Sequence, residues 1–391
     1  MADLLTEQMA RHAGDLAVAT AAGSRTYCDL LAALDSWRQR IDDAGVGPGA
    51  VATVEGEYGP DTIGAFLALT AARNIVVPLS RDSQTHAEAF ADLAEVEWRI
   101  SVRPEPFDKA QGGALEGGTE IVPTGRRATH EHYRTLRTRN APGLVLFSSG
   151  STGRHKAAVH DLSLLLKKFH TPRQRLRTLV FLQLDHIGGV NTLLYTLSNG
   201  GAAVVPPDRS PATVCEAIER YRVELLPTSP TFLNLLLLSG EHLRHNLSSL
   251  QLITYGTETM PESTLRRVHE AFPGARLQQT YGLTELGILR SQSRGNDSLW
   301  VRVGGEGYQT KVANGKLWIK AESAMLGYLN APSPFDSAGY FDTGDRVEVD
   351  GEWLRILGRE SEIINVGGSK VYPAEVEDAL LELDDLTDVT V

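Results

Sequence analysis

The sequence contains only two cysteines, Cys28 and Cys215, which lie far apart along the chain. Their spacing matches neither a disulfide framework nor a cysteine-rich metal centre, so we expect two inert, buried thiols in a reducing compartment. The N-terminus lacks the basic region and apolar core of an export signal. No apolar run approaches the length that spans a bilayer. These absences predict a soluble, cytoplasmic protein.

Basic residues are in deficit, with 38 Lys and Arg against 49 Asp and Glu and a formal net charge of −11. Nucleic acids and anionic membranes require clustered Lys and Arg, so we expect neither as the main partner. The 42% hydrophobic and 22% charged content is that of an ordinary globular protein. A chain of 391 residues is longer than a single hydrophobic core usually accommodates, so we expect two or more lobes.

Helical and strand-like hydrophobic patterns alternate over the first part of the chain. Residues 29–37 and 62–72 carry apolar residues at helical spacing, and 75–79 is an apolar run typical of a buried strand. A second round of similar period covers 178–227. Alternation of this kind predicts an α/β fold with two doubly wound layers and largely parallel sheets.

The pattern changes from about Leu299 to short strands separated by Gly and Asn turns. Asn314 and Gly315 stand between two alternating runs, which is a strong hairpin signal. We therefore expect a small β-barrel lobe after the α/β layers. Residues 103–120 are rich in Pro, Gly and Glu and are expected to form a surface loop.

An apolar run at 144–147 is typical of a buried strand and leads into a loop of serine, threonine and glycine. Such a loop offers hydroxyl and backbone N–H donors, and its glycines let an oxyanion approach closely. It is not the P-loop of NTPases, because Arg154 and His155 follow the last glycine. A flexible connection is the alternative. The candidate phosphate-binding residues are Ser148, Ser149, Gly150, Ser151, Thr152, Gly153 and Lys156.

Four further motifs follow this loop in a fixed order. They are Tyr-Gly-Leu-Thr-Glu at 281–285, Tyr-Phe-Asp-Thr-Gly-Asp at 340–345, Gly-Arg-Glu-Ser-Glu at 358–362, and a segment at 365–377 that contains Val-Gly-Gly-Ser-Lys. Together with the loop at 148–156 they resemble the adenylate-forming superfamily. That superfamily includes acyl-CoA synthetases, the adenylation domains of peptide synthetases, and luciferases. The resemblance covers nearly the whole chain.

The resemblance implies that ATP activates a carboxylic acid to an acyl-adenylate and that pyrophosphate is released. It implies that Lys156 acts with the phosphate loop and that Thr284 contacts the α-phosphate. Glu285 is the expected Mg²⁺ ligand, because Mg²⁺ binds through few carboxylates together with phosphate oxygens.

By the same resemblance, Tyr281 and Gly282 lie against the adenine of the nucleotide. Asp345 would accept hydrogen bonds from the two ribose hydroxyls, and Arg359 would contact the ribose as well. The alternatives are a core tyrosine in a tight turn and an ion pair between Asp345 and an arginine. The motif predicts that Asp345 lies in a turn at the end of a strand.

Two further positions are expected to border the acyl group. Gly256, Thr257 and Glu258 loosely match the family's Gly-Gly-Ala-Pro loop beneath the adenine and the acyl group. His186 falls where relatives carry an aromatic residue or His beside the acid's carboxylate. Glycines 188–189 indicate close approach by another group. A core histidine is the alternative.

Ile187 follows His186, whereas amino-acid-activating members have an Asp there that binds the α-amino group. An α-amino acid is therefore disfavoured, although Asp185, one residue before His186, leaves that alternative open. Residues 365–373 resemble the acyl-CoA synthetase branch. The expected thiol acceptor is CoA or the phosphopantetheine of an acyl carrier protein.

We expect an AMP-binding domain over 1–357, a hinge at 358–361, and the start of an α+β C-terminal domain at 362–391. The rest of that domain, which carries a catalytic lysine in relatives, is expected to be absent, so catalysis would be impaired. His155 replaces the usual Pro, and Ser361 replaces the usual Asp or Lys. These departures support an alternative function as a nucleotide-binding module without turnover.

Overall fold

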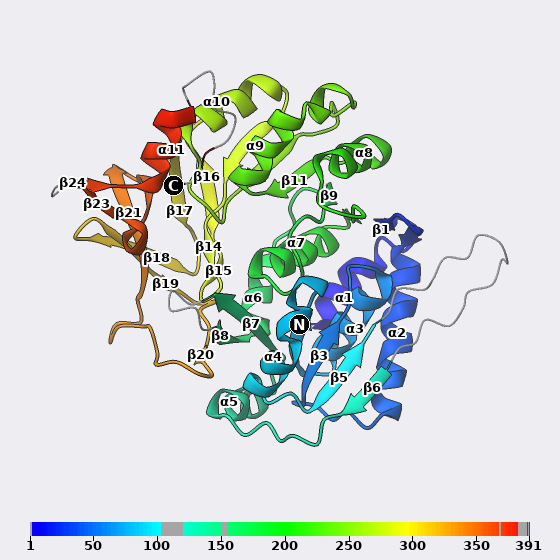
Figure 1. The fold of residues 1–391 in the computed structure, drawn as a ribbon. Coiled ribbons are helices and arrows are strands. Elements are labelled where there is room, and N and C mark those ends of the chain that lie inside the picture. Colours follow the sequence, from blue (N-terminus) through cyan, green and yellow to red (C-terminus); the bar gives the residue numbers. More distant parts are fainter. Residues whose placement is uncertain (1, 103–119, 150–154, 367–368, 382–388, 390) are drawn as a thin grey trace. The chain divides into compact units, whose positions relative to one another are not determined.

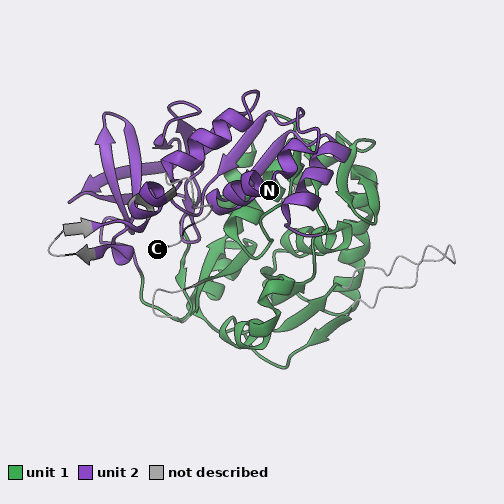
Figure 2. Ribbon diagram, turned by 45° about the horizontal axis from the view of Figure 1, so that its top comes forward, with its two compact units in different colours: residues 1–207, 323–333 green, residues 208–322, 334–391 purple. Residues whose placement is uncertain are grey.

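The computed structural model describes residues 2–102, 120–149, 155–366, 369–381, 389 and 391. The chain divides into two compact units, shown in Figure 2. The first unit contains Met1–Pro207 and Ser323–Ser333, and the second contains Asp208–Glu322 and Pro334–Val391. The expected hinge at 358–361 lies within the second unit, and the boundaries drawn from the sequence stay a prediction.

The larger sheet of the first unit has seven strands, which in sheet order are β20 Gly327–Tyr328, β8 His155–Asp161, β7 Gly143–Ser149, β4 Ile75–Leu79, β3 Val51–Glu55, β5 Trp98–Ser101 and β6 Glu120–Pro123. Strands β7, β4, β3 and β5 run parallel, whereas β6, β8 and β20 pair antiparallel with their neighbours. All five residues of β4 are buried, which explains its continuous apolar sequence.

Two helices fill the space between this sheet and a second group of strands in the same unit. Helix α2 (Tyr27–Asp43) packs on α3 (Pro60–Ala71), and α3 packs on β3 and β4 (Figure 1). Thr26 and Asp29 form a capping box that starts α2. The second group, in sheet order, is β9 Arg177–Leu179, β10 Ala202–Val204, β1 Leu16–Thr20 and β2 Gly23–Thr26.

The other helical segments of the first unit are short, except for α7. They are α1 Ala2–Ala10, η1 Arg81–His86, α4 Ala87–Leu93, α5 Glu131–Arg139, α6 Leu162–Leu166, η2 Lys167–Phe169 and α7 Ile187–Ser198. The tight 3₁₀ helix η1 directly follows the carboxyl end of β4 and leads into α4.

The second unit begins with an α/β layer. Its parallel strands are β11 Leu225–Thr228, β12 Leu252–Tyr255 and β13 Arg276–Gln279, and its helical segments are α8 Pro211–Tyr221, α9 Pro230–Ser239, η3 Glu241–Leu243 and α10 Glu262–Ala271. Ser210 and Ser229 cap α8 and α9, and each serine is followed by a proline at the first helical position. This Ser-Pro pair is a strong helix-start signal.

A six-stranded antiparallel sheet forms the β lobe of the second unit. In sheet order its strands are β16 Arg290–Ser293, β17 Trp300–Gly304, β22 Trp353–Arg359, β21 Phe341–Asp350, β19 Lys316–Ala321 and β18 Tyr308–Ala313. Two small hairpins, a 3₁₀ turn and one helix complete the unit: β14 Gly282–Leu283, β15 Gly287–Ile288, η4 Glu360–Glu362, β23 Ile364–Val366, β24 Ser369–Val371 and α11 Pro373–Leu381.

The predicted α/β class with a β lobe is confirmed. The hairpin at 314–315 is confirmed too, since both of its turn residues take positive φ. The buried state predicted for both cysteines is wrong for Cys28, which is exposed. Residues 103–119 of the predicted surface loop lie outside the described residues. No helix in the described ranges has the length and apolar character needed to cross a bilayer.

Candidate functional site

The predicted phosphate loop joins two antiparallel strands of the first unit. Strands β7 and β8 place Ser148 opposite Lys156 and Ser149 opposite His155. The pattern of the sequence predicted β7 but not β8. Gly150, Ser151, Thr152 and Gly153 lie outside the described residues. The pairing brings the first serine of the loop and its lysine to the same end of the hairpin.

The start of β8 is held by the segment that follows β20. The Asn330 amide donates to the His155 carbonyl at 2.8 Å, and its oxygen accepts from the Ala157 N–H at 3.1 Å. The Lys156 ammonium lies 5.2 Å from the ring centroid of Tyr328, a cation–π distance. Asn330 and Tyr328 were not predicted, because 327–330 carries no chemical pattern of its own. The Asn330 side chain fixes the backbone on both sides of Lys156, and Tyr328 contacts its ammonium group.

His155 packs in an aromatic cluster rather than pointing away from the protein. Its ring lies 5.0 Å from the rings of His86 and Phe90, and Phe90 stacks on Phe147 at 3.9 Å. The histidine that stands where relatives have proline therefore has a packing role. The cluster ties the loop hairpin to η1 and α4.

His186 is the N-cap residue of α7, and its side chain is 65% exposed. The core alternative for His186 is therefore wrong. The two glycines after it have an explanation within the chain: a Cβ on Gly189 would meet the Gln183 carbonyl at 1.8 Å, and one on Gly188 would meet Leu182 at 2.6 Å. The close approach inferred from these glycines is made by the chain's own loop.

Asp185 is buried and held by the turn after β4. One of its carboxylate oxygens accepts from the Ser80 N–H at 3.2 Å, the Ser80 hydroxyl at 2.6 Å and the Ser83 hydroxyl at 2.5 Å. Within the described part of the chain its other oxygen has no hydrogen-bond partner, although His186 Nε2 lies 3.8 Å away. The carboxylate thus fastens η1 to the loop before α7, and this weakens the suggestion that it binds an amino group.

In the second unit, Tyr281 and Asp345 meet directly. The Tyr281 hydroxyl donates to Asp345 Oδ2, and the two residues are only 8% and 7% exposed. Asp345 lies inside the long strand β21, beside a register shift and after Gly344 with a φ of 73°. The expected turn at a strand end is therefore wrong. An irregularity within a strand positions this carboxylate instead.

Arg359 lies opposite Asp345 in the pairing of β22 with β21. Its Nε is 3.6 Å from Asp345 Oδ1, which is the ion pair named as the alternative, and the ribose contacts of both residues stay a prediction. Burial raises the pKa of Asp345, while the Tyr281 hydrogen bond and the Arg359 charge act in the opposite direction. Burial also raises the pKa of Tyr281 well above its usual range, and the Asp345 charge adds to that increase. Tyr281 therefore keeps its proton and remains the donor.

The loop at 256–258 follows β12 and has a restrained backbone. A Cβ on Gly256 would lie 2.5 Å from the Thr280 hydroxyl, so only glycine fits there. Thr257 takes a φ of 74°, a left-handed conformation that is rare for a β-branched residue. Glu258 accepts from the Thr231 hydroxyl at 2.5 Å and its N–H at 3.2 Å, at the start of α9.

Thr284 and Glu285 lie in the turn between β14 and β15, and both are partly exposed. A Cβ on Gly282 would meet Ile288 at 2.4 Å, which explains that glycine by packing within the hairpin. No three His, Cys, Asp or Glu side chains of the described residues gather as a metal site. A single carboxylate such as Glu285 is nevertheless compatible with Mg²⁺, which binds through few carboxylates together with phosphate oxygens and water.

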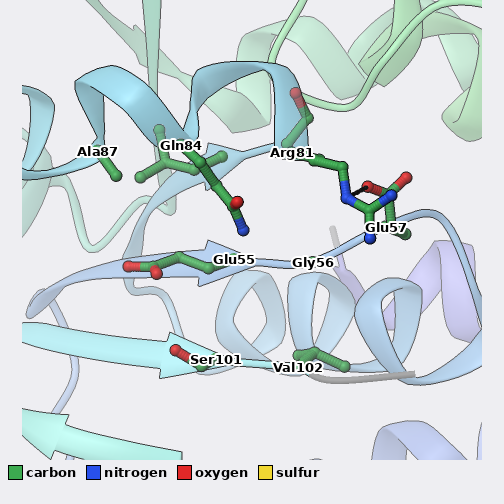
Figure 3. A pocket seen from close by; sticks show the side chains of 10 residues that line it. Glu55, Gly56, Glu57, Arg81, Gln84, Ala87, Ser101 and Val102 are labelled. Atoms are coloured by element: carbon green, nitrogen blue, oxygen red, sulfur yellow. Dashed lines mark ion pairs between the residues drawn. The ribbon is translucent and has the colours of Figure 1, made fainter. Parts of the chain in front are cut away.

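A separate cavity of about 390 Å³ opens within the first unit, next to the carboxyl ends of β3, β4 and β5 (Figure 3). The Gln84 side chain points from η1 toward the strands (Figure 3). Arg81 faces Glu57, and Arg81 Nε lies 3.5 Å from Glu57 Oε1. None of the residues that the sequence analysis assigned to the nucleotide or the acid lines this cavity.

Comparison with known proteins supports the resemblance. Residues 5–329 match the family described as AMP-binding enzyme. The chain is 31% identical over 277 residues to the indoleacetate–CoA ligase of Aromatoleum aromaticum. The aligned region covers 64% of this chain and 54% of that ligase. It spans about half the length of the curated relatives it matches.

Two solved structures illustrate the likeness in fold. ATP-bound MatB from Rhodopseudomonas palustris gives a TM-score of 0.76 at 21% identity, with 98% of this chain and 83% of MatB covered. The anthranilate CoA ligase AuaEII, in complex with anthranoyl-AMP, gives 0.77 at 20% identity, with 99% and 82% covered. At these identities the matches show a shared fold.

Proposed function

This chain belongs to the AMP-binding enzyme family, and from that premise we propose that it activates a carboxylic acid with ATP and passes the acyl group to a thiol. A carboxylate oxygen attacks the α-phosphorus, and the bond to the bridging oxygen of the β-phosphate breaks. Pyrophosphate leaves and an acyl-adenylate forms. A thiolate then attacks the acyl carbon, AMP leaves, and a thioester results.

The observation that carries this proposal is the meeting of Tyr281, Asp345 and Arg359 in one cluster of the second unit. These residues come from three separate sequence motifs, and the resemblance assigns each of them to the nucleoside. We propose that Asp345 accepts the ribose hydroxyls, that Arg359 contacts the ribose, and that the Tyr281 ring lies against the adenine. A carboxylate with two oxygens suits two adjacent hydroxyl donors.

We propose the phosphate-binding roles for the β7–β8 hairpin and for the turn between β14 and β15. Ser148, Ser149 and the loop at 150–153 would donate to the phosphates, and Lys156 would offset their charge. Thr284 would donate to the α-phosphate. Glu285 would hold Mg²⁺, which supplies charge neutralisation at the phosphate oxygens when it is bound.

The acid and the acceptor are proposed from the relatives and from the loop near His186. His186 is exposed and is proposed to lie beside the acid's carboxylate, with 256–258 beneath the acyl group. We rank aromatic acids first, because the relatives carry names such as indoleacetate–CoA ligase and 4-coumarate–CoA ligase. CoA is the first acceptor for the same reason, and a carrier-protein phosphopantetheine is the second. We propose a cytoplasmic location, which the two cysteines fit.

The test is mass-spectrometric detection of acyl-AMP. The protein is incubated with ATP, Mg²⁺ and a panel of aryl, short-chain, medium-chain and amino acids, and pyrophosphate release is followed in parallel. We expect an adenylate from one acid class. Asp345→Ala should weaken ATP binding at least about tenfold, because hydrogen bonds to a charged group are lost. ATP binding without any adenylate would favour a nucleotide-binding module without turnover.

A further inference from the structure

We infer that Tyr281 is a positioning residue whose hydroxyl holds and orients the Asp345 carboxylate for the ribose of the nucleotide. The inference rests on the proposed function, because it assigns a partner to the residue proposed to bind the ribose. It adds a role for the Tyr281 hydroxyl, which is distinct from a contact between the tyrosine ring and the base.

The hydrogen bond has a defined direction and sits in a buried network. Tyr281 donates to Asp345 Oδ2, since its own pKa is raised well above the usual range. The Asp345 N–H donates to the Thr343 hydroxyl at 3.1 Å, and that hydroxyl donates to the Leu317 carbonyl at 2.7 Å. The backbone and one carboxylate oxygen of Asp345 are thus both fixed before any nucleotide binds.

The charges around Asp345 leave the tyrosine hydroxyl as its closest stabilising group. Burial raises the pKa of Asp345, and the charges of Glu362 and Asp342 add to that increase. The Tyr281 hydrogen bond is the largest opposing effect, ahead of the charge of Arg359. Arg359 lies at 3.6 Å and is about half exposed, so solvent screens its charge.

The predicted consequence is a pH dependence that appears only for ligands with ribose hydroxyls. An ionised carboxylate accepts both hydroxyls, whereas a protonated one has lost part of that capacity. Affinity for the ribose should therefore fall as the pH drops through the pKa of Asp345. Removing the Tyr281 hydroxyl raises that pKa further, so the fall should occur at a higher pH.

The experiment compares the dissociation constants of ATP and 2′,3′-dideoxy-ATP between about pH 5 and pH 8. The ratio used is the dissociation constant of 2′,3′-dideoxy-ATP divided by that of ATP, and it cancels the titration of the phosphates, which both ligands share. Tyr281→Phe should lower the ratio roughly tenfold near the acid end and much less near pH 8. Tyr27→Phe, which removes another buried tyrosine hydroxyl, should leave the ratio unchanged at every pH.

Three other results would overturn the inference, and they are distinguishable. If the wild-type protein does not bind ATP, the proposed function fails as well. If the wild-type protein binds both nucleotides equally, Asp345 does not bind the ribose hydroxyls. If Tyr281→Phe lowers the ratio by one factor at all pH values, the hydroxyl is merely structural.

Asp345→Asn keeps the inference testable even if the Tyr281 variant fails to fold. Asparagine accepts the Tyr281 hydrogen bond but cannot ionise. The variant's ratio of dissociation constants should therefore be low and should not change with pH. A ratio that still falls at acid pH in Asp345→Asn would assign the titration to another group and refute the inference.

Discussion

Replacing Thr257 with glycine should stabilise this protein, because the threonine is held in a conformation that glycine adopts freely. Its φ of 74° lies in the left-handed region, and its side chain is exposed. The loop cannot easily relax, since Gly256 packs against Thr280 and Glu258 is bonded to Thr231. The superfamily's loop has glycine at this position, whereas this chain keeps the backbone conformation without it.

The expected gain follows from two opposing contributions. A non-glycine residue in a rarely populated backbone region costs about 1–3 kcal/mol. Glycine removes that strain but increases the entropy of the unfolded chain, at a cost of about 0.5–1 kcal/mol. Because Thr257 is exposed, little packing is lost. The net change should therefore be about 0.5–2 kcal/mol in favour of the folded state.

Urea unfolding of wild type, Thr257→Gly and Thr257→Ala measures this difference. The glycine variant should unfold at a higher urea midpoint with an unchanged m-value. The alanine variant is the matched control, because it retains a Cβ and so keeps most of the strain. A glycine variant that is less stable than wild type, or an alanine variant that gains equally, would refute the strain argument.

Three further predictions concern buried groups. Burial raises the pKa of Asp345, so the folded state binds the proton more tightly and the residue's contribution to stability falls as the pH rises. The unfolding free energy of Asp345→Asn, relative to wild type, should therefore be higher at pH 7 than near pH 4, by about 1.4 kcal/mol per pKa unit. Urea unfolding at both pH values measures this difference. Burial raises the pKa of Cys215 to about 12, so Ellman's reagent should titrate only Cys28 in native protein and both thiols in urea. Tyr27→Phe leaves the Gly201 carbonyl without its 2.6 Å donor and should cost about 1–3 kcal/mol in unfolding free energy.

The parts of the fold that were predictable are those in which burial imposes a clear pattern. Strand β4 is a continuous apolar run because both its faces are covered. Asn314 and Gly315 mark their hairpin because both residues take positive φ. Strand β8 was missed, since His155–Asp161 mixes charged and small residues without alternation. Its strand conformation comes from pairing with β7, which no local pattern records.

The candidate site divides in the same way. The motifs assigned Tyr281 and Asp345 to the nucleoside one by one, but their hydrogen bond joins residues 64 positions apart. The sequence alone leaves Asp185 open as an amine ligand, because its partners, Ser80 and Ser83, lie more than 100 positions earlier. Sequence motifs therefore predict which residues carry chemistry. Which of them satisfy one another was determined by packing between distant elements.

Two departures from the superfamily pattern, His155 and Thr257, have a common physical explanation. At 155 the backbone is fixed by the Asn330 side chain, which bonds the His155 carbonyl and the next N–H. At 257 it is fixed by the close contact of Gly256 and by the bonded carboxylate of Glu258. In both places contacts from neighbouring residues fix the backbone at the substituted position. Neither departure by itself therefore argues against turnover.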